Sequence, residues 1–132
     1  MNTPNITCIL KSLRPGAEWV VSIGTGSLED DYNTIEWHDE KQSKPTLEEV
    51  LEIYPILVEQ EPMKRLKEYR NILLYHSDWS QTPDIPDSVK IPWAEYRQKL
   101  RDLPKDSNPI LCDTREHPSG VTNVDWPIRP SN

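Results

Sequence analysis

The sequence has no phenylalanine, only four glycines and two cysteines, and no long apolar run. Without phenylalanine, its five tryptophans and five tyrosines must supply the aromatic part of any core. No stretch approaches the roughly 18 apolar residues that a membrane-spanning helix needs. The opening MNTPNITCIL is also unlike a secretory signal, so we expect a protein that is soluble and intracellular when made. Because Cys8 and Cys112 lack metal-like spacing, we expect two free thiols.

Positive charge is also scarce. The chain has 22 acidic and 15 basic residues, which gives a net charge of −7. This balance argues against nucleic acid or an anionic membrane as the main partner, because both attract a basic surface. The charge is unevenly distributed: residues 29–61 carry eleven acids and two lysines, whereas residues 62–105 carry nine basic and six acidic residues. Such asymmetry is usually solvated surface, and the alternative is docking onto a basic partner.

The chain of 132 residues, 13 of them proline, is long enough for one modest core. We expect an α+β fold that begins with a small antiparallel β hairpin or meander in residues 1–45. Residues 6–10, 18–23 and 32–37 are the expected strands, with turns between them. The GTGS sequence at residues 24–27 is expected to be a hairpin turn, since it lacks the further residues of a phosphate-binding loop.

Residues 46–104 are expected to form a compact module of about three short helices. Thr46 and Glu49 have the spacing of a capping box at the start of the first helix. Pro55 should end or kink that helix, and Pro62 should begin the second. The second helix should end near Tyr75 or His76.

The third helix is expected to start at Pro92 and to end at Pro104, after a loop at residues 78–91. The remaining residues, 105–132, are expected to be an irregular, extended and proline-rich C-terminal arm. Prolines at positions 127 and 130 exclude a helix there.

Acidic side chains in the 78–91 loop precede a helix that carries Arg97 and Arg101. If the loop folds back, Asp78 or Asp84 can pair with an arginine, and bidentate pairs of this kind hold geometry well. We interpret this arrangement as a structural clamp. A catalytic carboxylate is the much weaker alternative, because no partner group lies at a chemically telling spacing.

The three histidines give no chemical signature. His76 stands next to Ser77 and Asp78, but adjacent residues rarely converge as a catalytic triad must. His38 and His117 lack the spacing of a zinc site. We therefore expect no catalytic residues, no metal and no cofactor.

The tryptophans can serve the core or a partner. Trp93 repeats with Tyr96 at helical spacing and is the strongest core candidate. Trp126 lies in a proline-flanked tail and is expected to contact a more distant groove or another protein, because tryptophan is favoured at interface hot spots.

Residues 70–104, RNILLYHSDWSQTPDIPDSVKIPWAEYRQKLRDLP, followed after a spacer by VDWPIRP, resemble the bacteriophage tail assembly chaperone family. The likeness covers roughly residues 65–130. The order of residue types is shared: an arginine and a leucine pair, Asp-Trp, Pro-Asp, Trp, Tyr-Arg, Leu-Arg-Asp and Pro, then Trp-Pro. The matching residues are Arg70, Leu73, Leu74, Asp78, Trp79, Pro83, Asp84, Trp93, Tyr96, Arg97, Leu100, Arg101, Asp102, Pro104, Trp126 and Pro127.

This resemblance implies non-enzymatic work in building a phage tail or tail fibre in the host cytoplasm. The expected partner is a tail or fibre protein, and a homo-oligomer is left open. Two alternatives remain: a permanent component of the virion, such as an adaptor between tail and fibre, and an inhibitor of a host defence protein. The residues expected to define the module or bind the partner are Asp78, Trp79, Asp84, Trp93, Tyr96, Arg97, Arg101 and Trp126.

Overall fold

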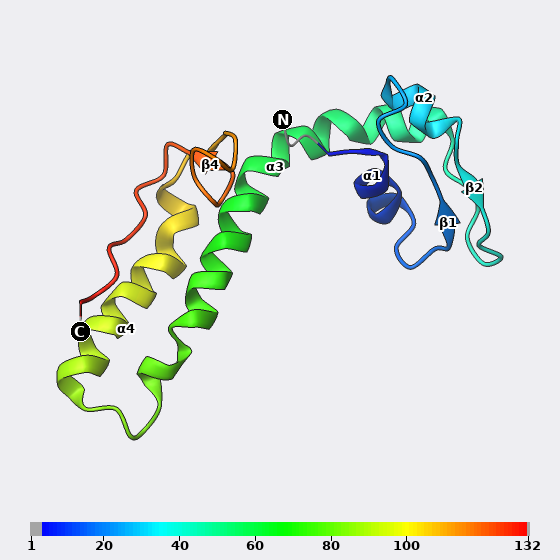
Figure 1. Cartoon of the computed structure of the whole chain (residues 1–132). Helices are drawn as coiled ribbons and strands as arrows, with labels where there is room; N and C mark the ends of the chain where they lie inside the picture. The colour runs from blue at the N-terminus through cyan, green and yellow to red at the C-terminus, as the bar shows by residue number, and fades with distance from the viewer. Residues whose placement is uncertain (1–3, 132) are drawn as a thin grey trace. The chain divides into compact units, whose positions relative to one another are not determined.

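The structure, a computed structural model, describes residues 4–131 (Figure 1). The chain divides between Glu61 and Pro62 into two compact units, here called the N-terminal unit and the C-terminal unit. The described residues form a mixed α+β fold that is mostly helical, with two small antiparallel hairpins. None of its helices is long and apolar enough to cross a membrane. The division into domains 1–45, 46–104 and 105–132 stays a prediction.

The first element is a helix, α1 (Ile6–Leu13), so the strand expected at residues 6–10 is wrong. Asn5 caps the helix, because its side chain accepts a hydrogen bond from the backbone N–H of Cys8 at 3.1 Å. Ile6, Ile9 and Leu10 are fully buried, and their spacing is that of one helical face. The β-branched isoleucines suggested a strand, but burial of this face on the core outweighs their local preference.

Two short strands form the first hairpin. Strand β1 (Trp19–Val20) pairs antiparallel with β2 (Glu36–Trp37), and Trp19 lies opposite Trp37. The antiparallel pair is therefore present, although each strand is much shorter than expected. Between them lies α2 (Leu28–Tyr32), so the GTGS loop leads into a helix and is not a tight hairpin turn.

The carboxylate of Asp31 organises the GTGS loop. It accepts hydrogen bonds from the backbone N–H groups of Gly24 and Thr25, at 3.2 and 2.9 Å, and from the Thr25 hydroxyl. The Thr25 hydroxyl and the loop N–H groups lower the pKa of Asp31 from its ordinary value, because they stabilise the charged form. The donors of this glycine-containing loop are thus directed at an acidic group of the chain itself.

Helix α3 (Leu47–His76) continues through both prolines at which a break was expected. Thr46 caps it by accepting from the N–H of Glu49 at 3.1 Å, whereas Glu49 pairs with Arg14 at 2.9 Å and makes no capping box. The expected end at His76 is correct, but the end at Pro55 and the new start at Pro62 are wrong. A proline costs a helix about 3 kcal/mol, which apolar packing on either side can offset.

The core-facing residues of α3 change their helical spacing at the boundary between the two units. Before Glu61 the core-facing side chains are Val50, Ile53, Tyr54 and Leu57. After Pro62 they are Met63, Leu66, Leu73 and Leu74. The second set does not continue the three-and-four spacing of the first, so one continuous helix has the sequence pattern of two.

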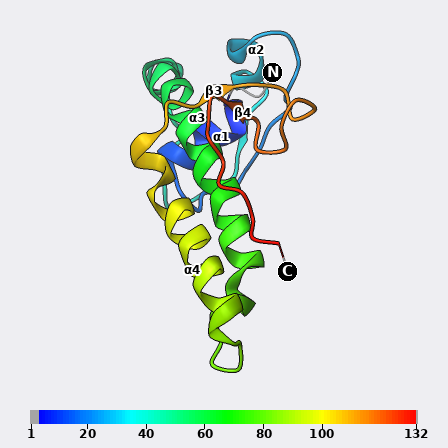
Figure 2. The same ribbon diagram turned by 90° about the vertical axis from the view of Figure 1, so that its left-hand side faces the viewer.

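The C-terminal unit contains an α-helical hairpin. The second half of α3 runs beside α4 (Asp87–Asp102), and the views in Figures 1 and 2 agree on this. A 3-10 turn, η1 (Asp78–Gln81), follows α3, and a second, η2 (Leu103–Asp106), follows α4. The expected start of this helix at Pro92 is wrong: Pro86, with φ of −64°, precedes the first turn, and Pro92 lies inside the helix.

Residues 105–132 were expected to be wholly irregular, but part of this range forms a hairpin. Strand β3 (Ile110–Leu111) pairs antiparallel with β4 (Val121–Thr122). Gly120, with φ of +78°, closes this hairpin, where an added side chain would lie 2.9 Å from the guanidinium of Arg65. Val121 is fully buried with Leu66 and Leu103. The hairpin thus packs against one end of the α3–α4 pair.

The Asp31→Asn substitution should reduce the acid sensitivity of the N-terminal unit. A carboxylate whose pKa is depressed by folding adds stability above its unfolded value, and this stability is lost as pH falls through the folded-state value. The variant should therefore melt below the wild type at neutral pH, and the difference should shrink toward and below pH 3.8. Thermal unfolding at a series of pH values measures this, and a difference independent of pH would contradict it.

Replacing Pro55 with alanine should stabilise the protein by up to about 3 kcal/mol, since it restores a helix hydrogen bond and removes a steric clash. Pro55 is exposed, so little packing is lost. The matched control is Pro45→Ala: this proline precedes α3 and is fully buried, and its replacement should destabilise. Denaturant unfolding compares the two variants, and a less stable Pro55→Ala protein would show that the helix needs its proline.

Candidate functional site

Arg97 joins three segments of the C-terminal unit. It lies on α4, and its Nη1 donates to the backbone carbonyl of Leu74 at 2.6 Å and to the hydroxyl of Ser77 at 2.7 Å. Its Nη2 forms an ion pair with Asp78 at 2.9 Å. The guanidinium therefore binds the end of α3, the start of η1 and its own helix together, as planar multi-donor arginine is suited to do.

The acidic partner is the more dispensable half of this clamp. The Arg97 side chain is 12% exposed, whereas that of Asp78 is 61% exposed. Within residues 4–131, Asp84 makes no ion pair, and Arg101 hydrogen-bonds only to Gln98, at 3.2 Å. Asp84 and Arg101 are thus not brought into the clamp. A second contact reinforces the loop, where Gln81 donates to the carbonyl of Lys90 in α4 at 3.2 Å.

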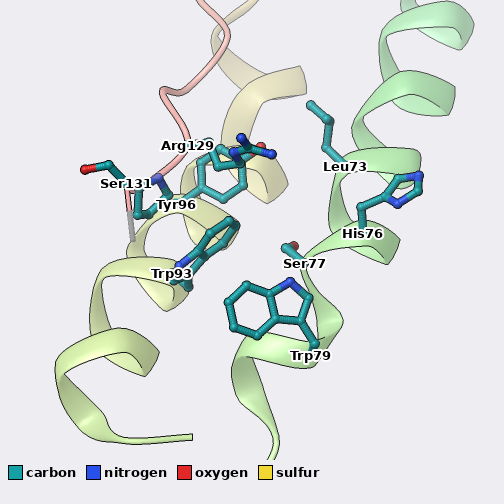
Figure 3. A pocket seen from close by; sticks show the side chains of 9 residues that line it. Leu73, His76, Ser77, Trp79, Trp93, Tyr96, Arg129 and Ser131 are labelled. Atoms are coloured by element: carbon teal, nitrogen blue, oxygen red, sulfur yellow. The ribbon is translucent and has the colours of Figure 1, made fainter.

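Three aromatic side chains line a pocket beside the clamp (Figure 3). Trp79 of η1 meets Trp93 of α4 edge-on, with ring centroids 5.1 Å apart, and Trp93 meets Tyr96 in the same way at 5.6 Å. Trp93 and Tyr96 are 5% and 6% exposed, while Trp79 is 43% exposed. Burial raises the pKa of the Tyr96 hydroxyl. The aromatic group is thus firmly held at its base and accessible at Trp79.

The pocket has a volume of about 640 Å³, within the usual range of roughly 300–1,000 Å³ for ligand sites. Its other walls come from the last turn of α3 and from the C-terminal residues. The remaining lining residues are Leu73, His76, Ser77, Arg129, Pro130 and Ser131. Sequence reasoning missed the C-terminal contribution.

Trp126 packs on its own unit. Its ring stacks on that of His117 at 5.6 Å between centroids and meets that of Tyr69 edge-on at 5.1 Å. It is half-buried and contacts both apolar clusters of the unit, the one around Leu66 and the one around Trp93. The groove it fills is therefore on this chain, and contact of Trp126 with another protein stays a prediction.

The polar residues near the pocket form structural contacts. Ser77 is 2% exposed and donates to the carbonyl of Leu74, while Asp78 pairs with Arg97. His76 packs edge-on against Tyr75, so the three adjacent residues are not arranged as a triad. Across residues 4–131, no three His, Cys, Asp or Glu side chains gather as metal ligands would. Both Cys8 and Cys112 are free thiols.

Comparison with known proteins now places the C-terminal unit. A family model described as "Phage tail assembly chaperone protein" matches residues 63–131, more than half of the chain. The chain belongs to the phage tail assembly chaperone family. The resemblance found in the sequence is thereby confirmed, and it connects the chain to phage tail assembly. Neither a curated protein nor a solved structure matches the chain.

The matched region of this chaperone coincides closely with the C-terminal unit, which begins at Pro62. It contains α4, the Arg97 clamp, the aromatic pocket and Trp126. The acidic N-terminal unit lies outside the match. The pocket is therefore a feature of the part of the chain that carries the family likeness.

Substitutions at the two ends of the clamp should have very unequal effects. Arg97→Ala removes two charge-assisted hydrogen bonds, one to the Ser77 hydroxyl and one to the Leu74 carbonyl, which keeps only its bonds from Ser77. A hydrogen bond to a charged group contributes about 1.5–3 kcal/mol. Asp78→Asn removes an exposed ion pair and should cost less than about 1 kcal/mol. Denaturant unfolding of both variants tests this order, and equal losses would mean that the charge pair itself is the main contribution.

Proposed function

We propose that this protein assists phage tail assembly without catalysis, by holding a tail or tail-fibre protein on its C-terminal unit in the host cytoplasm. The observation that carries the proposal is a run of exposed apolar side chains at the end of the helical hairpin. Ile72 and Tyr75, one turn apart on α3, are 50% and 76% exposed, and Trp79 follows at 43%.

These side chains are backed by a rigid frame. Trp93, Tyr96 and Arg97 hold Trp79 and the start of η1 in place through ring contacts and the clamp. An interface of this type needs aromatic contacts on a preorganised support. The N-terminal unit, with the acidic residues of α2 and the first half of α3, would supply a second contact surface for a basic partner.

A phage that lacks this gene should fail to build complete tails, and the wild-type protein supplied from a plasmid should restore them. Complementation with Tyr75→Ser or Trp79→Ala should restore far fewer infectious particles, because each removes an exposed contact. The matched control is Ile110→Ser, a comparably exposed residue of β3 at 56%, which should complement fully. Equal complementation by all three variants would contradict the proposed surface.

The composition of purified particles shows whether the protein leaves the tail after assembly or stays in the virion. We expect mass spectrometry to find it in infected-cell extracts and not at constant stoichiometry in finished virions. Its presence at a constant copy number per particle would support a permanent component. Normal tails in the deletion phage, with growth lost only in certain hosts, would support an inhibitor of host defence.

A further inference from the structure

The last residues of the chain carry a Pro-x-x-Pro sequence, Pro127-Ile128-Arg129-Pro130, next to the aromatic pocket. Both prolines are half-buried, whereas Ile128 is 93% exposed and Arg129 is exposed. The two prolines are thus the more buried residues of this sequence, and their spacing of three matches the three residues per turn of a polyproline II helix. Pro130 lines the pocket together with Trp79, Trp93 and Tyr96.

This arrangement matches a known mode of peptide recognition. Proline-rich segments with prolines three apart dock on grooves lined by tryptophan and tyrosine, because their extended form is already ordered before binding. Figure 3 shows the C-terminal segment passing over Tyr96 and Trp93, with Trp79 across the pocket. The chain therefore presents both halves of such an interaction, a groove and a proline segment beside it.

Only packing holds the C-terminal segment beside the aromatic groove. Within the described residues, 124–131 make no hydrogen bond or ion pair, so the segment is kept in place by packing of Trp126 and its neighbours. The segment also leaves much of the pocket open, since about 640 Å³ remains beside Pro130. A segment with these properties can be displaced beyond Trp126 without breaking hydrogen bonds.

We propose that the Trp79–Trp93–Tyr96 pocket binds an extended Pro-x-x-Pro segment of another protein, and that the chain's own Pro127–Pro130 segment competes for the same groove. This inference names the ligand of the surface described under the proposed function and partly rests on it. The C-terminal segment would then occupy part of the aromatic groove until a partner replaces it.

The test uses the full chain and a short acetylated peptide with a Pro-x-x-Pro core. Tryptophan fluorescence and the indole N–H signals of Trp79 and Trp93 report binding. We expect saturable binding, and at least tenfold weaker binding for a peptide with both prolines replaced by alanine. Equal binding of the two peptides, or no binding at all, would overturn the proposal.

Variants of the chain test the groove and the competition separately. Trp79→Ala should weaken peptide binding at least tenfold, whereas Ile110→Ala should leave it unchanged. Truncation after Pro127, which retains Trp126, should strengthen binding several-fold, because Pro130 no longer competes. Circular dichroism must show that each variant is folded. Unchanged affinity after truncation would remove the competition from the proposal.

Three further outcomes separate this inference from its rivals. A full-length dimer that disappears on truncation would indicate exchange of C-terminal segments between copies, and would overturn binding of a foreign segment. If no peptide binds while Trp79→Ala still abolishes tail assembly, the proposed function stands and only the proline ligand fails. If peptides bind but Trp79→Ala supports normal assembly, the pocket exists and its role in assembly fails.

Discussion

The Arg97 guanidinium is the interaction on which the C-terminal unit depends. It replaces the helical partner that the carbonyl of Leu74 lacks at the end of α3, and it holds Ser77 and Asp78 where the chain turns into η1. Trp79 follows immediately, so the position of this exposed tryptophan over Trp93 is set by the same contact. A charged group that is 12% exposed is costly to bury, and its several hydrogen bonds offset that cost.

The aromatic residues fall into a buried group and an exposed group. Trp93, Tyr96 and Trp126 join the apolar clusters and compensate for the absence of phenylalanine. Trp79, Tyr75 and Ile72 remain exposed on the same unit, in the part of the chain that the family model matches. A rigid base with exposed apolar groups suits a protein that must hold partners, because little conformational freedom is lost when they bind.

The proposed competition by the C-terminal segment would give this surface a means of control. Its prolines face the protein, its intervening residues face solvent, and packing without hydrogen bonds holds it. An assembly factor must release what it binds, and an internal competitor of moderate affinity favours release. The same segment would reduce the exposed aromatic surface when no partner is present, which limits non-specific association.

Local patterns were sufficient for some of these features. The Thr46 cap, the end of α3 at His76, the presence of an antiparallel hairpin in the N-terminal unit and the family likeness all rest on residues close in sequence or on a motif. An acidic loop before an arginine-bearing helix likewise predicted a clamp, although only contact in space selected Asp78 and excluded Asp84 and Arg101.

Tertiary packing decided the rest. Burial of Ile6, Ile9 and Leu10 stabilised a helix in a segment with β-branched residues. Apolar packing before and after Pro55 and Pro62 kept α3 helical through both prolines. The pocket itself joins residues 73–79, 93–96 and 129–131, and no local pattern brings such distant segments together. Their meeting depends on which apolar surfaces pack most favourably, a property of the whole folded chain.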